Sequence, residues 1–511
     1  MKRNWPLSTS GSDVGRRSII YIVATTLQKL SSVVLLPIYT RLFTPEEYGY
    51  FNLIVTFTLF AGALGLFGLD YAVMRFCHKG LFANDALGRC ESEIEVAGRY
   101  FTASIALVAA FSTIVTLLLV MGSPIYGHIV FPGLPLYPVI TIALLALLFQ
   151  PLTMLYLAQL QAQTRARAFG YYSVAYFVSN ALLTIGLVGG LQLGLLGTTV
   201  AILTVNIIFA LAALIDSWRR GLLWHRFDRK SVMQLLHYSF PMLPHSLSLQ
   251  ATSLVTRVTI SNFISVAAAG LFNVAMYAVN FIDAIQTALH RAYLPWYFSR
   301  SERRDSSWRA EVHEMVIAFI AINVVSSIGV SLFAYECLLL LAPPSFLEAA
   351  AIVPVLALSM MIKSIYYPEL SVLLSESTGT RRVLAISLSS SAASVVLGVI
   401  GALWLGLLGV AISQVIQRSL MSALAVALAR RANGPGMPWL RIFRLQGFGL
   451  LAIASVLVGD GYNWWGLNEG AVAGLKSVSL VVLVCALVLS EPRLLEVARR
   501  VVVRRGGRAE T

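Results

Sequence analysis

The sequence predicts an all-α polytopic membrane protein with about 14 transmembrane helices: two parallel six-helix repeats followed by two C-terminal helices. The prediction depends on the composition, the placement of Lys and Arg, and an internal repeat. Of the 511 residues, 58% are hydrophobic and 12% are charged, whereas soluble domains have about 45–50% apolar and about 25% charged residues. So few charges cannot cover the surface of a soluble chain of this length, and four cysteines make no disulfide framework.

Each predicted helix is an apolar stretch of about 20 residues, the length that crosses a bilayer. The thirteenth is the weakest, because Arg444 interrupts its start and Asp460 closes it early. The first follows a basic lead with no small-residue cleavage site, so it is interpreted as a retained helix rather than a signal peptide. The segments are 18–38, 51–74, 100–121, 137–160, 170–190, 195–216, 239–263, 270–294, 312–335, 349–374, 383–403, 408–429, 443–459 and 471–490.

The Lys and Arg residues between these segments predict the orientation. With the N-terminus in the cytoplasm, the inner loops and tails hold 31 of them and the outer loops hold one, Arg41. Cytoplasmic loops are enriched in Lys and Arg, so both termini are expected in the cytoplasm. The net charge of +14 then reflects topology rather than nucleic-acid binding. The loops are too short for a nucleotide-binding domain, and no Walker A sequence is present.

Two sequence matches lie at equivalent places in the two sets of six helices. Residues 42–53 (LFTPEEYGYFNL) and 263–274 (FISVAAAGLFNV) share Gly, Phe and Asn in register. Residues 191–197 (LQLGLLG) and 403–409 (LWLGLLG) both fall between the fifth and sixth helices of a set. Because six is an even number, both halves start on the same side of the membrane and form parallel repeats, with a cleft expected between them.

These boundaries define the predicted organisation. The linker between the halves is basic and aromatic, which favours an amphipathic helix on the inner leaflet, with a plain connecting loop as the alternative. The predicted parts are an N-terminal six-helix lobe (1–217), a basic cytoplasmic linker (218–238), a C-terminal six-helix lobe (239–430), helices 13 and 14 (431–490) and a basic cytoplasmic tail (491–511).

Six cations fall inside the predicted spans. Arg291 and Lys476 lie close to span ends, where long side chains reach the interface. A cation at mid-bilayer costs at least about 2.5–3.5 kcal/mol, so the deeper four are expected to face a water-filled cavity. Such a cavity selects an anionic solute, and a diphosphate would form charge-assisted hydrogen bonds with it. The four predicted substrate-binding cations are Lys29, Arg257, Lys363 and Arg418.

Polar side chains recur at steps of three and four along several of the same helices, which places them on one helix face. The alternative is that these stripes join neighbouring helices by hydrogen bonds. Pro354 and Pro368 predict kinks beside Lys363. Asp70 and Asp283 are candidates for coupling to a proton or to sodium, although Asp283 could instead pair with Lys363 or Arg418. The polar cavity residues are predicted to be Gln250, Asn280, His290, Tyr366, Tyr367 and Gln414.

The loop after the first helix contains a helix start, in which Thr44 is the N-cap, proline follows, and Glu46 and Glu47 occupy the first turn. Arg41 lies close by in sequence. It could form an outer gate with Glu46 or Glu47, or an exposed ion pair worth less than about 1 kcal/mol. The glycines at 62, 65 and 68 lie inside a span, so they indicate close helix packing rather than a nucleotide loop.

The stretches SSVVLLPIYTRLFTPEEYGYFNLIVTF and GLFGLDYAVMRF resemble the polysaccharide transporter branch of the multidrug/oligosaccharidyl-lipid/polysaccharide exporter superfamily, the Wzx-type oligosaccharide flippases. The shared features are Pro37, Tyr39–Arg41, Tyr48–Gly49, and Gly68, Leu69, Asp70 and Arg75. The resemblance implies two six-helix bundles in the bacterial cytoplasmic (inner) membrane. They would move a polyprenyl-diphosphate-linked oligosaccharide from the inner to the outer leaflet by alternating access, for lipopolysaccharide or exopolysaccharide biosynthesis. Helices 13 and 14 depart from the commoner twelve-helix pattern of this family. A count of fourteen is similar to that of the related lipid II flippases, in which the extra pair of helices forms a groove for the lipid tail.

Two other function classes remain as alternatives. A cation-coupled multidrug-type antiporter would need embedded acids, whereas helices 1 and 7 each carry a cation and no acid. A glycan polymerase or ligase would need acids or histidines in its outer loops, which here are mostly apolar, so the chain is not expected to be an enzyme. No cofactor or metal is expected. The expected partners are the lipid-linked glycan, membrane lipids and the polysaccharide polymerase or glycosyltransferase machinery, with no nucleic acid.

Overall fold

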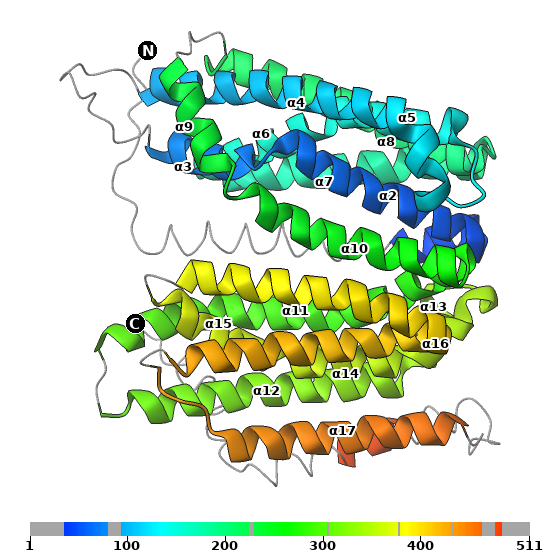
Figure 1. The fold of residues 1–511 in the computed structure, drawn as a ribbon, viewed down its shortest axis with the longest axis vertical. Helices are drawn as coiled ribbons and strands as arrows, with labels where there is room; N and C mark the ends of the chain where they lie inside the picture. Colours follow the sequence, from blue (N-terminus) through cyan, green and yellow to red (C-terminus); the bar gives the residue numbers. More distant parts are fainter. Residues whose placement is uncertain are drawn as a thin grey trace, which may run out of the picture. The chain divides into compact units, whose positions relative to one another are not determined.

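The computed structural model describes residues 35–79, 93–223, 229–303, 306–376, 379–431, 434–461 and 476–482. Within these ranges the regular structure is entirely helical (Figure 1), which confirms the predicted fold class. The contacts divide the chain into two compact units, 1–262 and 263–511. Residues 239–262, which the sequence assigns to the second lobe, therefore group with the first unit.

Unit 1 is a bundle of helices with its core between α3, α4 and α6. Leu69, Phe101 and Leu155 are fully buried there. Its elements are α2 (Pro45–Leu66), α3 (Leu69–Lys79), α4 (Glu93–Val130), η1 (Leu136–Ile140), α5 (Thr141–Leu145), η2 (Ala146–Leu148), α6 (Gln150–Ala162), α7 (Ala166–Thr184), η3 (Ile185–Gly190), α8 (Gly194–Arg219), α9 (Arg229–Ser239) and α10 (Leu243–Phe263).

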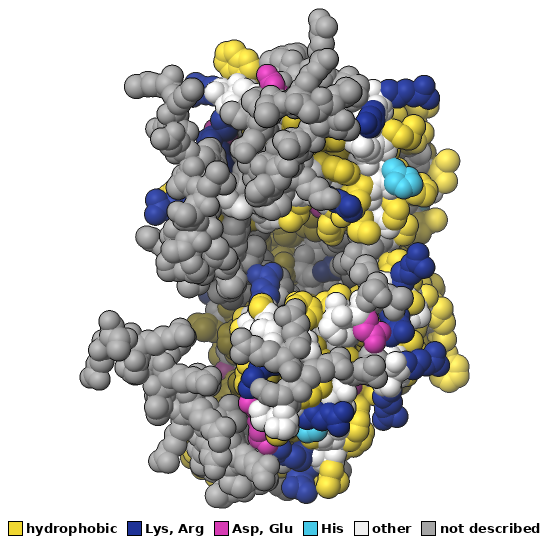
Figure 2. Space-filling model, turned by 90° about the vertical axis from the view of Figure 1, so that its left-hand side faces the viewer, with side chains coloured by type: hydrophobic (Ala, Val, Ile, Leu, Met, Phe, Trp, Pro, Cys, Tyr) yellow, Lys and Arg dark blue, Asp and Glu magenta, His cyan; other side chains and the backbone are white. Residues whose placement is uncertain are grey.

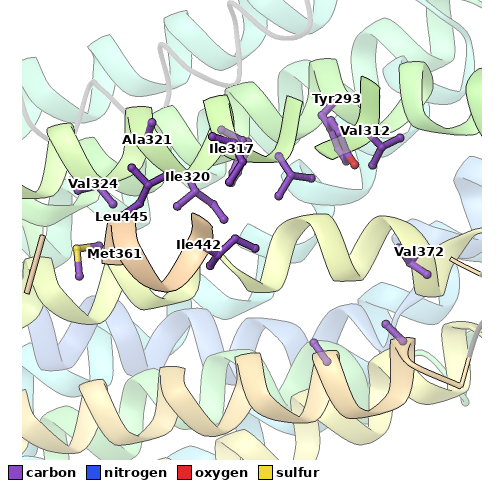
Figure 3. Packing of buried hydrophobic residues seen from close by; sticks show 14 of the residues in the cluster. Tyr293, Val312, Ile317, Ile320, Ala321, Val324, Met361, Val372, Ile442 and Leu445 are labelled. Carbon is purple, nitrogen blue, oxygen red and sulfur yellow. The ribbon is translucent and has the colours of Figure 1, made fainter. Parts of the chain in front are cut away.

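Unit 2 is a second helical bundle, with a core formed mainly by α12, α14, α16 and α17. Val312, Ile320 and Val324 of α12 are fully buried in one cluster with Ile442 and Leu445 of α17 (Figure 3). Its elements are α11 (Val266–Arg303), α12 (Trp308–Leu332), α13 (Ala334–Leu341), η4 (Pro344–Ile352), α14 (Val353–Lys363), α15 (Tyr366–Leu374), α16 (Gly379–Ala429) and α17 (Trp439–Gly461).

Ten helical stretches among the described residues are long and apolar enough to cross a membrane. The predicted count of about 14 stays a prediction, because most of the first and fourteenth spans lies outside the described residues. The eleventh and twelfth spans appear as the single element α16, in which the chain reverses at Gly406. The chain is thus a multi-pass membrane protein.

Both LxLGLLG segments have a positive-φ glycine where the chain turns between two helical stretches. Gly194 and Gly406 occupy equivalent positions, and both have a positive φ, 52° and 59°. On the two sides of the second turn, the backbones of Gly401 and Gly409 lie in contact, since a Cβ on Gly409 would lie 2.0 Å from the Gly401 oxygen. The left-handed region favours glycine, and so close a helix contact requires it. The sequence repeat therefore corresponds to a repeated structural element.

The predicted glycine packing inside α2 is also present. A Cβ on Gly65 would lie 2.8 Å from Oγ of Ser112 on α4, and one on Gly62 would contact Gln150 of α6. Gly68 has φ 71° and follows Phe67, which ends α2 in the left-handed region. The glycines thus allow close packing and a break between α2 and α3.

Candidate functional site

An ion pair lies inside the bundle of unit 2. Nζ of Lys363, the last residue of α14, lies 2.5 Å from Oδ1 of Asp283 on α11. The two side chains are only 12% and 24% exposed. The same ammonium lies 5.3 Å from the ring centroid of Tyr367 on α15, within cation–π range. Side chains of three helices thus surround one embedded cation, and the ion pair of Lys363 with Asp283 is one of the two pairings that the sequence left open.

A helix break positions Lys363. The helix stops after this residue, Ser364 and Ile365 form a tight turn with i→i+3 hydrogen bonds, and α15 begins at Tyr366. Pro368 explains the break, since it has no N–H to donate to the carbonyl of Ser364 and its ring crowds that carbonyl. The predicted kink is therefore present beside the embedded cation.

Polar side chains from three other helices donate hydrogen bonds to the last carbonyls before the break. Each donor lies deep in the bundle, and an unsatisfied carbonyl there would cost several kcal/mol. Nε2 of Gln286 (α11) donates to Met360 at 2.6 Å, Nε2 of Gln446 (α17) to Met361 at 3.1 Å, and Oγ of Ser422 (α16) to Ile362 at 3.2 Å. The break is therefore a fixed part of the bundle.

An aromatic and histidine group extends the site along α11 and α15. The rings of His290 and Tyr367 lie 4.9 Å apart, and Nε2 of His290 lies 3.2 Å from Oγ of Ser371. Tyr366 packs edge-on against Tyr367 at 5.8 Å. Both predicted tyrosines and the predicted histidine thus lie together next to Lys363.

Arg418 on α16 belongs to the same electrostatic group. Its side chain is half-buried, and its charge interacts with Asp283 and with Tyr367. Its Nε is buried and has no hydrogen-bond partner. Gln414, one turn earlier, lies 3.5 Å from Oγ of Ser394 on the other arm of the α16 hairpin. The group therefore carries two cations and one carboxylate, with a guanidinium N–H left to donate.

Two predicted site residues, Arg257 and Gln250, lie on α10 of unit 1. Arg257 on α10 bonds through a terminal nitrogen to the carbonyl and the hydroxyl of Ser253, one turn earlier. Gln250 is half-buried on the same helix. Lys29 lies outside the described residues. Arg257 is therefore hydrogen-bonded to a serine of the same helix.

The predicted outer-gate residues have local partners. Thr44 and Glu47 form a complete capping box, in which the Thr44 N–H donates to Oε2 of Glu47 at 2.9 Å. Arg41 donates to the carbonyl of Pro37 at 3.1 Å. No ion pair joins Arg41 to Glu46 or Glu47 in the described part of the chain.

Two further predicted residues lie apart from the ion pair. Asn280 is exposed on α11, one turn before Asp283. Asp70 lies in the first turn of α3, where the helix dipole stabilises a carboxylate. One of its oxygens is buried with no hydrogen-bond partner among the described residues. No His, Cys, Asp and Glu cluster among the described residues could hold a metal ion.

The sequence reasoning missed the capping residues Gln286 and Gln446. Both are buried, at 0% and 9% exposure. The sequence carries no signal for their role, because the carbonyls that they bind belong to another helix, 74 and 85 residues away in the chain. Lys476 also differs from its expected reach to the interface, because it is 8% exposed and lies 2.8 Å from Oε1 of Glu336 on α13.

Solved structures with this fold are transporters and flippases. A lipid II flippase MurJ in an inward closed conformation has a TM-score of 0.70 at 12% identity, covering 93% of this chain and 100% of that chain. A multidrug resistance MATE family transporter of the MOP superfamily, inward-facing, has a TM-score of 0.60 at 16% identity, covering 84% and 99%. A MOP superfamily transporter from Pyrococcus furiosus has 0.55 at 14%, covering 85% and 96%.

The sequence comparisons point to one family. No curated protein matches the chain significantly. The family model described as "Polysaccharide biosynthesis protein" matches residues 14–302, more than half of the sequence. The family match and the shared fold confirm the predicted resemblance and the helical membrane fold. With an all-helical fold shared with flippases and with this match, the chain belongs to the polysaccharide biosynthesis protein family.

Proposed function

We propose that this protein is a flippase that moves a polyprenyl-diphosphate-linked oligosaccharide across the bacterial inner membrane by alternating access, for surface polysaccharide biosynthesis. The observation that carries the proposal is the group formed by Lys363, Arg418 and Asp283. Lys363 pairs with Asp283, and Arg418 lies near enough to interact electrostatically with the same carboxylate. Two cations and one carboxylate leave this group with a net positive charge. A diphosphate supplies the anionic oxygens that such a group would bind.

The neighbouring aromatic residues support a glycan as the second part of the substrate. Tyr366, Tyr367 and His290 lie beside Lys363 and offer ring faces together with polar edges. Arg257 and Lys29 complete the proposed set of phosphate ligands. The polyprenyl tail remains in the lipid, and the glycan polymerase or glycosyltransferase machinery supplies and consumes the substrate.

The coupling ion is proposed to be a proton or sodium, with Asp283 or Asp70 as its carboxylate. The ion pair of Asp283 with Lys363 gives the coupling a physical form. A phosphate that binds Lys363 would weaken its hold on Asp283, and the carboxylate would then be open to a cation. Asp70 has a buried oxygen without a hydrogen-bond partner and is the second candidate.

The test is transport by the purified full-length protein in vesicles. Lys363→Ala and Arg418→Ala should each reduce flipping of a fluorescent polyprenyl-diphosphate-linked glycan at least tenfold. Arg291→Ala is the matched control, because Arg291 is an exposed arginine on α11, the helix of Asp283, and it should transport normally. Unchanged transport by the Lys363 and Arg418 variants would overturn the assignment.

A cation-coupled multidrug-type antiporter is the alternative, favoured by the fold shared with MATE transporters. The same vesicles separate the two functions. A net-positive site should reject cationic dyes, so dye uptake against a proton or sodium gradient, with no glycan flipping, would support the antiporter.

A further inference from the structure

An apolar groove of about 460 Å³ lies on unit 1, beside α9. Phe67, between α2 and α3, and Phe111 of α4 form one wall. Met233 and Leu236 of α9, with Phe240 just after it, form the other. This volume lies within the range of about 300–1,000 Å³ that is usual for small-molecule sites, and the lining is suited to a hydrocarbon chain.

The aromatic walls of the groove are held in place. The rings of Phe67 and Phe111 stack at 4.6 Å, and Phe240 lies 6.4 Å from Phe67. A Cβ on Gly68 would lie 3.0 Å from the carbonyl oxygen of Ser239, so the α2–α3 break fits closely against the end of α9. Phe240 nevertheless remains 65% exposed. The protein therefore leaves a preformed apolar surface uncovered.

The helix α9 is attached to unit 1 along one face. Ser231, Leu235 and Ser239 recur every four residues and are buried, and α9 packs against α3 and α4. Oη of Tyr100 on α4 donates to Oε1 of Gln234 at 2.6 Å. In Figure 1, α9 runs steeply across the ends of α3 and α4. A helix that crosses the membrane-spanning helices in this way lies along the membrane surface, as its amphipathic pattern also indicates.

Cations lie at the start of α9. Arg229 and Lys230 are exposed, and Met233 follows three to four residues later on the same helix face. Arg75 of α3 is exposed and lies 4.5 Å above the ring of Tyr238. None of these three side chains forms an ion pair within the described residues. Figure 2, which faces this end of the helices, shows many Lys and Arg side chains and few acidic ones.

We propose that the groove binds an acyl chain of an anionic phospholipid, whose phosphate headgroup contacts Arg229 and Lys230. Charge complementarity along one helix face supports an anionic lipid, since cations at the membrane surface lie one turn from the apolar groove. A zwitterionic lipid carries no net charge and would gain less from these cations than an anionic lipid does. The site lies within unit 1 and contains none of the residues assigned to glycan transport, so it does not depend on the proposed function.

The test uses the full chain in vesicles of phosphatidylcholine with a minor share of phosphatidylglycerol. A photo-crosslinking residue, p-benzoylphenylalanine, replaces Phe240 beside the groove. In the matched control it replaces Leu118 of α4, which is equally exposed at 65%. After irradiation, mass spectrometry measures which lipid is attached. Phosphatidylglycerol should be enriched over its bilayer share by on the order of fivefold at position 240, and not at position 118.

The cations are tested in the same crosslinking experiment. The double variant Arg229→Gln, Lys230→Gln should return the lipid composition at position 240 to that of the bilayer. The pair Arg309→Gln, Arg431→Gln removes two exposed arginines elsewhere and should leave the enrichment intact. Bilayer composition at position 240 in the otherwise unchanged protein overturns the proposal, as does enrichment that survives loss of Arg229 and Lys230. Added undecaprenyl phosphate that displaces phosphatidylglycerol would assign the groove to a polyprenyl tail instead.

Discussion

The ammonium of Lys363 lies 2.5 Å from the carboxylate of Asp283, although 80 residues separate them in the chain. Each charge thereby stabilises the other inside a membrane-spanning bundle. A phosphate that enters this site must compete with Asp283 for Lys363. Substrate binding and rearrangement of the ion pair are therefore expected to be linked.

The ion pair predicts non-additive changes in stability. Lys363→Met removes the ammonium beside Asp283, and Asp283→Asn removes the carboxylate beside Lys363, so each should destabilise by up to about 3–5 kcal/mol. The double variant should lose less than the sum, with a coupling energy of about 0.5–3 kcal/mol. Thermal unfolding of the detergent-purified protein measures all four states. Strict additivity would show that the contact contributes nothing.

The capped break predicts a stability effect distant from any charge. Gln446→Leu removes donors to the carbonyl of Met361 and to Oγ of Ser364, which should cost about 1–3 kcal/mol. Gln414→Leu is the control, because its single hydrogen bond measures 3.5 Å and should contribute little. The unfolding temperatures of the two variants decide. Equal unfolding temperatures would mean that the hydrogen bond of Gln446 to the Met361 carbonyl does not contribute to stability.

The turn within α16 predicts contrasting effects of two alanine substitutions. Gly409→Ala would place a Cβ 2.0 Å from the Gly401 oxygen, so the hairpin should separate, and the yield of monodisperse protein on gel filtration should fall sharply. Gly398→Ala, in the same hairpin, meets its nearest atom at 3.9 Å and should behave as wild type. A normal yield from Gly409→Ala would contradict the close helix contact.

Charge and capping can be separated at Glu47. Glutamine also serves in a capping box, so Glu47→Gln should keep the stability, while Glu47→Ala should lose about 1 kcal/mol. Glu46→Ala is the neighbouring control. Transport measured on the same variants tests the predicted outer gate. If the gate needs the charge, Glu47→Gln will lower transport while leaving the unfolding temperature unchanged.

Much of the fold was predictable because the membrane restricts what the chain can form. Backbone groups in lipid must bond internally, so apolar stretches of this length have to be helical. The positions of Pro368 and of the two LxLGLLG segments carried local information about a break and two turns, and these features appear where predicted. The group of Lys363, Tyr367 and His290 was also foreseen as members of one site.

The partners of these residues were harder to predict. Helical spacing tells which side chains share a face, but not which helix lies opposite. The sequence therefore left open whether Asp283 pairs with Lys363 or with Arg418, and only the packing of α11 against α14 decides it. Gln286 and Gln446 were missed for the same reason. Each binds a backbone carbonyl of α14, at Met360 and Met361, and its own sequence does not show that α14 lies opposite.

The cross-links at the α14–α15 break have a mechanical consequence. A proline kink in a membrane helix often serves as a hinge, but here side chains from α11, α16 and α17 fasten it on three sides. Flexing at this point would break all three attachments at once. The second unit should therefore move as a rigid body, and the hinge of a transport cycle should lie outside the α14–α15 break.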